Sequence, residues 1–120
     1  MGGILIVEDD ASLRTVIRMV LEKAGYAVDE ARHGAAALDL LREDPPDLVI
    51  ADRRMPVMTG LELIREMRAQ PATAGIPVVL LSGMRDDVDP AERADAVIFK
   101  PFEPEDLLRT IRDLLETSGV

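Results

Sequence analysis

The stretch "ILIVEDD" at residues 4–10 places four apolar residues directly before three acids. An uninterrupted apolar run of this length is typical of a strand that is covered on both faces, as in a parallel sheet. Such a strand delivers Glu8, Asp9 and Asp10 to one place, where their like charges repel one another. Because this repulsion costs stability, the grouping of the three carboxylates needs an explanation from the fold.

Further strand-like runs alternate with amphipathic stretches along the chain. The runs that predict strands after the first are 26–31, 47–52, 76–83 and 96–99. The stretches whose apolar spacing predicts helices are 11–25, 34–44, 60–70 and 103–119. This alternation predicts an α/β fold, in which a five-stranded parallel sheet carries helices on both faces. The common doubly wound order of five strands is 2-1-3-4-5.

The composition describes a chain of ordinary domain size with a strong negative charge. With 120 residues, 48% of them apolar, we expect a single domain over residues 1–120. The net charge of −9 and the 2% aromatic content disfavour direct contact with nucleic acid or anionic membranes. Because no apolar run could cross a bilayer and no signal peptide is visible, we expect a cytoplasmic protein.

The predicted strand order brings together acids that are distant in sequence. Glu8 and Asp9 follow the first strand and Asp52 ends the third, and these two strands are neighbours in the predicted sheet. Ligands of open α/β sheets bind beyond the carboxyl ends of the strands at this point. Three adjacent carboxylates call for a cation, and oxygen ligands favour Mg²⁺ or Mn²⁺. Asp10 is expected to cap the following helix instead.

Two further polar side chains follow strands that end at the same edge of the predicted sheet. Ser82 ends the fourth strand and Lys100 follows the fifth. A hydroxyl, an ammonium and a cation held by carboxylates together suit the oxygens of a phosphoryl group. Because Asp52 stands alone at the end of its strand, we expect it to be the nucleophile that forms an aspartyl phosphate.

Four motifs resemble the receiver domain of two-component response regulators, in the order and spacing of that family and over essentially the whole chain. They are ILIVEDD (4–10), DLVIADRRMPVMTG (47–60), IPVVLLSG (76–83) and IFKPF (98–102). The resemblance implies a flavodoxin-like fold and a phosphoacceptor rather than a turnover enzyme. The roles it implies are Asp52 as phosphoacceptor, Glu8, Asp9, Asp52 and the Arg54 backbone carbonyl as Mg²⁺ ligands, Ser82 as switch hydroxyl, Lys100 as phosphate contact, and a cis peptide bond between Lys100 and Pro101.

Two features depart from the family pattern. Receivers usually carry an aromatic residue three places before the lysine, and its inward movement reports phosphorylation; here this position is Val97. The stretch from Ser82 to Lys100 is shorter than is usual in the family and contains Pro90 and few apolar residues, so we expect a short or irregular fourth helix. Both departures predict that output switching is atypical, although the phosphoryl-accepting residues are complete.

The combined prediction is a receiver domain that takes a phosphoryl group onto Asp52 from a histidine kinase or a histidine phosphotransfer protein, and then acts on an unidentified target protein. Two alternatives remain open. A pseudo-receiver that acts as a constitutive protein-binding module is favoured by Val97 and the weak fourth helix. A small Mg²⁺-dependent phosphohydrolase is disfavoured, because no second acid lies two places beyond Asp52.

Overall fold

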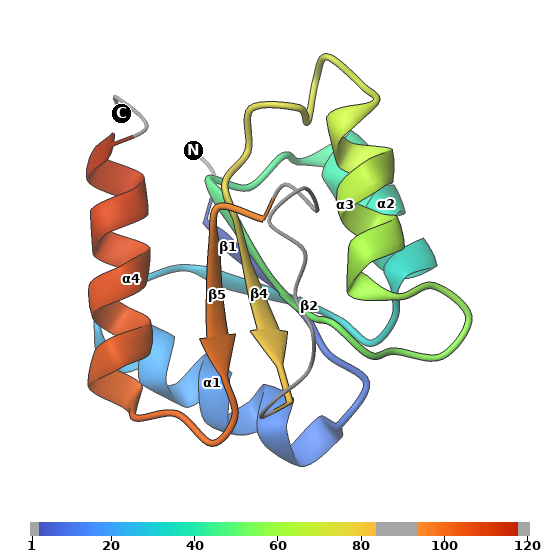
Figure 1. Cartoon of the computed structure of the whole chain (residues 1–120). Coiled ribbons are helices and arrows are strands. Elements are labelled where there is room, and N and C mark those ends of the chain that lie inside the picture. Colours follow the sequence, from blue (N-terminus) through green and yellow to red (C-terminus); the bar gives the residue numbers. More distant parts are fainter. Residues whose placement is uncertain (1–2, 84–93, 118–120) are drawn as a thin grey trace.

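The structure, a computed structural model, describes residues 3–83 and 94–117 and contains a parallel sheet between two layers of helices (Figure 1). The strands are β1 (Ile4–Val7), β2 (Val28–Ala31), β3 (Leu48–Asp52), β4 (Val78–Ser82) and β5 (Ala96–Phe99). The helices are α1 (Ala11–Lys23), α2 (Gly34–Glu43), α3 (Gly60–Arg68) and α4 (Pro104–Thr117). The order β2-β1-β3-β4-β5, with every neighbouring pair parallel, confirms the predicted doubly wound fold.

The short or irregular helix predicted between β4 and β5 falls mainly on residues 84–93, which lie outside the described residues. The helix labelled α4 is therefore the last predicted helix of the chain. It begins at Pro104, whose missing amide hydrogen is harmless in a first turn, and carries Glu105 and Asp106 at its positive end. None of the helices in the described ranges has the length and apolar character that crossing a membrane would require.

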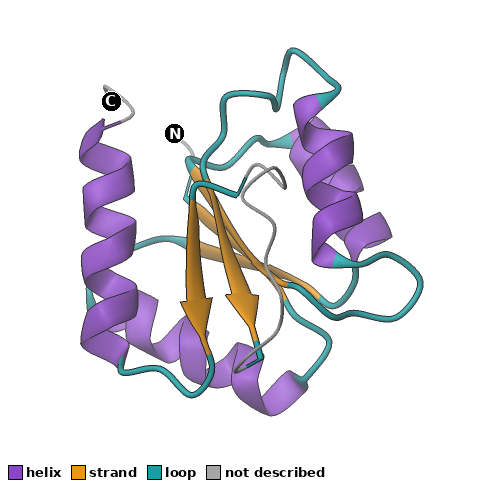
Figure 2. Cartoon of the chain, in the orientation of Figure 1, coloured by secondary structure: helices purple, strands orange, loops and turns teal. Residues whose placement is uncertain are grey.

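Each face of the sheet is covered by one pair of helices (Figure 2). α1 and α4 lie over one face, and α2 and α3 lie over the other (Figure 1). Side chains alternate along each strand, so Ile6 packs in one core with Ile17 and Leu107, whereas Val49 packs in the other with Leu63. Burial on both sides explains why these strands are continuous apolar runs.

Helices α1 and α3 begin at the carboxyl edge of the sheet. Asp10 caps α1, with its Oδ1 accepting hydrogen bonds from the amides of Ser12 at 2.9 Å and Leu13 at 3.2 Å, which confirms the predicted cap. Gly60 starts α3 against the end of β3, where a Cβ atom would lie 2.3 Å from the carbonyl oxygen of Asp52. Only glycine permits this approach. The loop that leaves Asp52 therefore returns to it.

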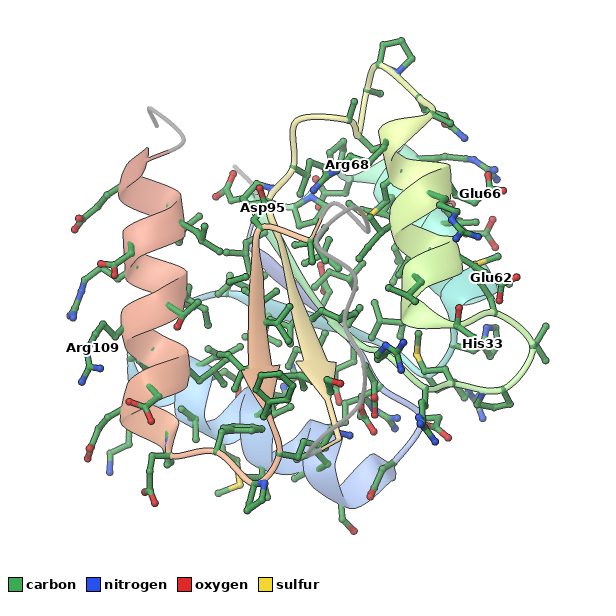
Figure 3. The ribbon with its side chains drawn as sticks, viewed as in Figure 1. His33, Glu62, Glu66, Arg68, Asp95 and Arg109 are labelled. Carbon is green, nitrogen blue, oxygen red and sulfur yellow. The ribbon has the colours of Figure 1, made fainter. Side chains whose placement is uncertain are left out.

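The amino edge of the sheet is closed by Arg68 and Asp95, which point toward one another in Figure 3. Arg68 donates hydrogen bonds to the carbonyl oxygens of Ala74 at 2.9 Å and Ile76 at 2.7 Å, and to Oδ2 of Asp95 at 2.8 Å. The same Asp95 oxygen accepts from the amide of Val78 at 2.7 Å. These bonds join α3 to the starts of β4 and β5, at the edge opposite the acidic residues.

Candidate functional site

The acids that were predicted to converge lie at the ends of β1 and β3. These strands pair with Val7 opposite Ala51, so Glu8 and Asp52 are the next residues of adjacent strands. Both are buried, with 1% and 5% of their surfaces exposed. One carboxylate oxygen from each of Glu8, Asp9 and Asp52 lies within 4.8 Å of the others, while Asp9 itself is exposed. The three residues therefore form a cluster that is open on the Asp9 side.

Lys100 joins this cluster from the end of β5. Its Nζ lies 2.6 Å from Oδ2 of Asp52 and 4.0 Å from Oε2 of Glu8. The Lys100 amide donates to the Ser82 carbonyl oxygen at 2.8 Å, which continues the pairing of β4 and β5 beyond the last residues of the strands. The peptide bond between Lys100 and Pro101 is cis, as the family resemblance implied. Backbone pairing thus delivers the ammonium to Asp52.

The surroundings of Asp52 favour its ionised form. Burial alone would raise the pKa of the Asp52 carboxyl, but the neighbouring Glu8, Lys100 and the Arg54 amide outweigh burial and hold that pKa below its ordinary value. The Arg54 amide donates to Oδ1 at 3.1 Å, and Lys100 donates to Oδ2. Asp52 is therefore a buried carboxylate whose two oxygens both have donors.

The surroundings of Glu8 disfavour its ionised form. Burial, and next the neighbouring Asp52, raise the pKa of Glu8 from 4.5 to about 8, although Lys100 and the Asp10 amide act in the opposite direction. The Asp10 amide donates to Oε1 at 3.2 Å, whereas Oε2 accepts no hydrogen bond from any described residue. A buried carboxylate oxygen without a donor, facing a second carboxylate, suits a hard cation with oxygen ligands. The cluster therefore fits the predicted Mg²⁺ or Mn²⁺.

Arg14 fixes the backbone that carries Glu8. Its Nη1 donates to the Glu8 carbonyl oxygen at 2.6 Å, and its Nε pairs with Oε1 of Glu30 on β2 at 3.0 Å. The Glu8 amide in turn donates to the Ala31 carbonyl oxygen at 3.0 Å. Arg14 and Glu30 carry no signal in the sequence that would pair them, because only the packing of α1 across β1 and β2 brings them together. Both peptide groups that flank Glu8 are thus held in place.

The remaining predicted residues lie around the same edge. Ser82 is fully buried at the end of β4, where its hydroxyl donates to the Gly83 carbonyl oxygen at 3.4 Å. Val97 is half-buried, pairs with Leu80, and packs against the core beneath α2 and α3. The role of Ser82 as a switch, and that of the Arg54 carbonyl as a metal ligand, stay predictions.

The burial of Glu8 predicts a stability gain on removing its charge. Because the folded-state pKa of about 8 lies above the ordinary 4.5, stability falls as pH rises through this window. We expect Glu8→Gln to raise the melting temperature of the metal-free protein by several degrees near the upper end of the window and by less near its lower end. Scanning calorimetry with a chelator measures this, with exposed Asp9→Asn as the matched control. A lower melting temperature for Glu8→Gln at the upper end would contradict the account.

Comparison with known proteins identifies the family of this chain. Residues 4–112 match the response regulator receiver domain. The DNA-binding response regulator MtrA of Mycolicibacterium paratuberculosis is 38% identical over 113 residues, which cover 91% of this chain and 49% of MtrA. The chain spans about half the length of the curated relatives it matches.

Solved structures agree with this assignment. The Vibrio cholerae chemotaxis protein CheY4 has a TM-score of 0.85 and 33% identity, over 95% of this chain and 98% of CheY4. The receiver domain of a Pseudomonas aeruginosa sensor histidine kinase, with a magnesium ion coordinated in its active-site cleft, has a TM-score of 0.88 and 28% identity, over 97% of this chain and 99% of that one. Receiver domains bind Mg²⁺ in an acidic pocket and take phosphoryl groups from histidine kinases, and they are not turnover enzymes on external substrates. This chain belongs to the family of response regulator receiver domains.

Proposed function

We propose that the chain accepts a phosphoryl group on Asp52 from the phosphohistidine of a histidine kinase or a histidine phosphotransfer protein. The observation that carries the proposal is a buried Asp52 carboxylate with Lys100 2.6 Å away and two further acids beside it. The lowered pKa of Asp52 means that the attacking group is already ionised. The donor histidine would belong to the partner protein.

The transfer requires one bond to form and one to break. An oxygen of Asp52 attacks the phosphorus atom, the phosphorus–nitrogen bond to the donor imidazole breaks, and the electron pair stays on that nitrogen. The product is an acyl phosphate on Asp52. Lys100 donates to Oδ2 before transfer and would donate to a phosphoryl oxygen during it, so its charge opposes the negative charge carried by the three phosphoryl oxygens.

The acidic residues would hold the divalent cation that this transfer needs. Glu8, Asp9 and Asp52 would provide carboxylate oxygens, and the Arg54 carbonyl would provide a further one. When bound, Mg²⁺ or Mn²⁺ supplies positive charge between the carboxylates and the phosphoryl oxygens. The free Oε2 of Glu8 supports this role, because that atom is buried without a hydrogen-bond donor among the described residues. The magnesium ion of the Pseudomonas receiver domain gives independent support.

The consequence of phosphorylation is proposed to begin at Ser82. Its carbonyl oxygen already accepts from the Lys100 amide, so movement of either residue is passed to the other through the backbone. The new phosphoryl group would attract the Ser82 hydroxyl and shift the end of β4. Val97 cannot make the large rotamer change of an aromatic side chain, and its partial burial in the core restrains it further. We therefore expect an atypical output.

A second candidate function is a constitutive protein-binding module with no phosphoryl transfer. The observation that favours it is Val97, which leaves the usual aromatic reporter absent. The complete set of Asp52, Lys100 and Ser82 opposes it. Thermal stabilisation by Mg²⁺ without phosphoryl incorporation would support this second function.

Nucleic-acid contact is proposed to be absent from this part of the molecule. The name of MtrA describes DNA binding by a protein of which this chain matches about half. The net charge of −9 opposes approach to DNA phosphates. Any DNA binding in a longer relative would then involve residues beyond the matched half.

Phosphoryl incorporation tests the proposed function. Incubation with acetyl phosphate and Mg²⁺ should add one phosphoryl group to the intact protein by mass spectrometry, because Asp52 is ionised and faces Lys100. No addition is expected in Asp52→Asn, which keeps the size of the side chain and loses the nucleophile, or after chelation of Mg²⁺. Full incorporation into Asp52→Asn would refute the assignment of the acceptor.

The lifetime of the acyl phosphate tests a role for Arg54. Its amide donates to Oδ1 of Asp52, and its exposed side chain starts from the edge of the pocket. We expect this side chain to shield the acyl phosphate from water, together with Met84, which lies outside the described residues. Arg54→Ala should shorten the lifetime several-fold, and Arg54→Lys should shorten it less, as followed by the decay of the phosphorylated mass. An unchanged lifetime in Arg54→Ala would remove Arg54 from this role.

A further inference from the structure

Val57 combines an unfavourable backbone conformation with an exposed apolar side chain. Its φ is +70°, the only positive value among the described non-glycine residues, and it is 96% exposed. The Met58 amide donates to the Pro56 carbonyl oxygen at 2.8 Å, so Val57 is the central residue of a γ-turn. At positive φ this turn is rare and strained, and a β-branched residue suits it least. Glycine would adopt the turn without strain.

Residues on both sides of this turn are anchored inward. Met55 is buried in the core, and the Met58 side chain lies so close to α2 that a Cβ atom on Gly34 would be 2.6 Å from its sulfur. Thr59 and Glu62 bond each other reciprocally at the start of α3, where Figure 3 shows Glu62 beside the loop, near His33. The anchored residues on both sides leave Pro56 and Val57 exposed at the tip of the loop.

The short span from this tip to Gly60 brings the tip within reach of a protein bound over Asp52. Gly60 packs against the Asp52 backbone, and its amide donates to the Arg53 carbonyl oxygen at 3.0 Å. Val57 is three residues from Gly60, a span of at most roughly 11 Å. A typical protein interface buries about 800 Å² on each partner, equivalent to a disc of about 16 Å radius. A small phosphodonor in the pocket would not extend so far.

From this geometry we infer that Val57 is an apolar contact for the protein phosphodonor, an inference that rests on the proposed function. The Val57 side chain is exposed and contributes neither to the core nor to the pocket. At this positive φ, a valine strains the turn, whereas a glycine would not. Asp52 is only 5% exposed, so a donor protein must press its phosphorylated histidine into the edge that carries this loop. A valine side chain contributes affinity when an apolar surface buries it, and it offers no charge to pair. The surface of the donor protein beside its phosphorylated histidine should therefore be apolar.

Phosphotransfer kinetics with two kinds of donor test the inference. The cytoplasmic parts of the histidine kinases of the source organism are autophosphorylated with radiolabelled ATP, and the kinase with the fastest transfer is the protein donor. Acetyl phosphate is the small donor. Val57→Thr keeps the shape and the strained turn but adds a hydroxyl, Val57→Ile keeps the apolar character, and Val57→Gly relieves the turn.

We expect Val57→Thr and Val57→Gly to lower kcat/KM for the kinase about ten-fold, as loss of a buried apolar contact predicts. Val57→Ile should retain most of the rate, all variants should react normally with acetyl phosphate, and Val57→Gly should melt no lower than the wild type. Three results would each overturn the contact. The first is an unchanged rate of transfer from the kinase to Val57→Thr, and the second is an equal loss of rate with acetyl phosphate. The third is a wild type that accepts a phosphoryl group from acetyl phosphate but from no kinase. Failure of the wild type with acetyl phosphate would instead overturn the proposed function.

Discussion

The pocket depends on how two buried carboxylates share one lysine. Asp52 and Glu8 end adjacent strands, and Lys100 lies 2.6 Å from the first and 4.0 Å from the second. The neighbouring Glu8, and then the Lys100 ammonium, hold the pKa of Asp52 down against the effect of burial, whereas burial and the neighbouring Asp52 raise the pKa of Glu8. In the proposed function this imbalance gives the two acids different roles: Asp52 would attack phosphorus, and Glu8, whose Oε2 lies 4.0 Å from the shared ammonium, would contact the cation.

The fold holds this unfavourable charge arrangement by making its backbone rigid. Both faces of the sheet are packed with apolar side chains, so the strand ends cannot separate to relieve repulsion. Arg14 bonds the Glu8 carbonyl, the Asp10 cap fixes the turn into α1, and Gly60 brings α3 against the Asp52 backbone. These contacts fix the backbone on both sides of the proposed phosphoryl-accepting site.

Much of this arrangement could be predicted from sequence, because it follows from periodicity and topology. The alternating strands and helices predicted the sheet order, and the sheet order alone placed Glu8, Asp9, Asp52 and Lys100 at one edge. The pairing of Arg14 with Glu30 could not be predicted, since it depends on how α1 crosses the sheet. The strained turn at Val57 could not be predicted either, because local preference favours glycine there and the anchoring of Met58 on α2 overrides it.

Reductive trapping of the phosphorylated protein tests the central claim most directly. Sodium borohydride reduces an aspartyl phosphate to homoserine, and peptide mapping by mass spectrometry then locates the modified position. After incubation with acetyl phosphate and Mg²⁺, the account predicts homoserine at position 52 and an unmodified Asp9. Homoserine at position 9, or a phosphoryl group that survives reduction on Ser82 or His33, would contradict it.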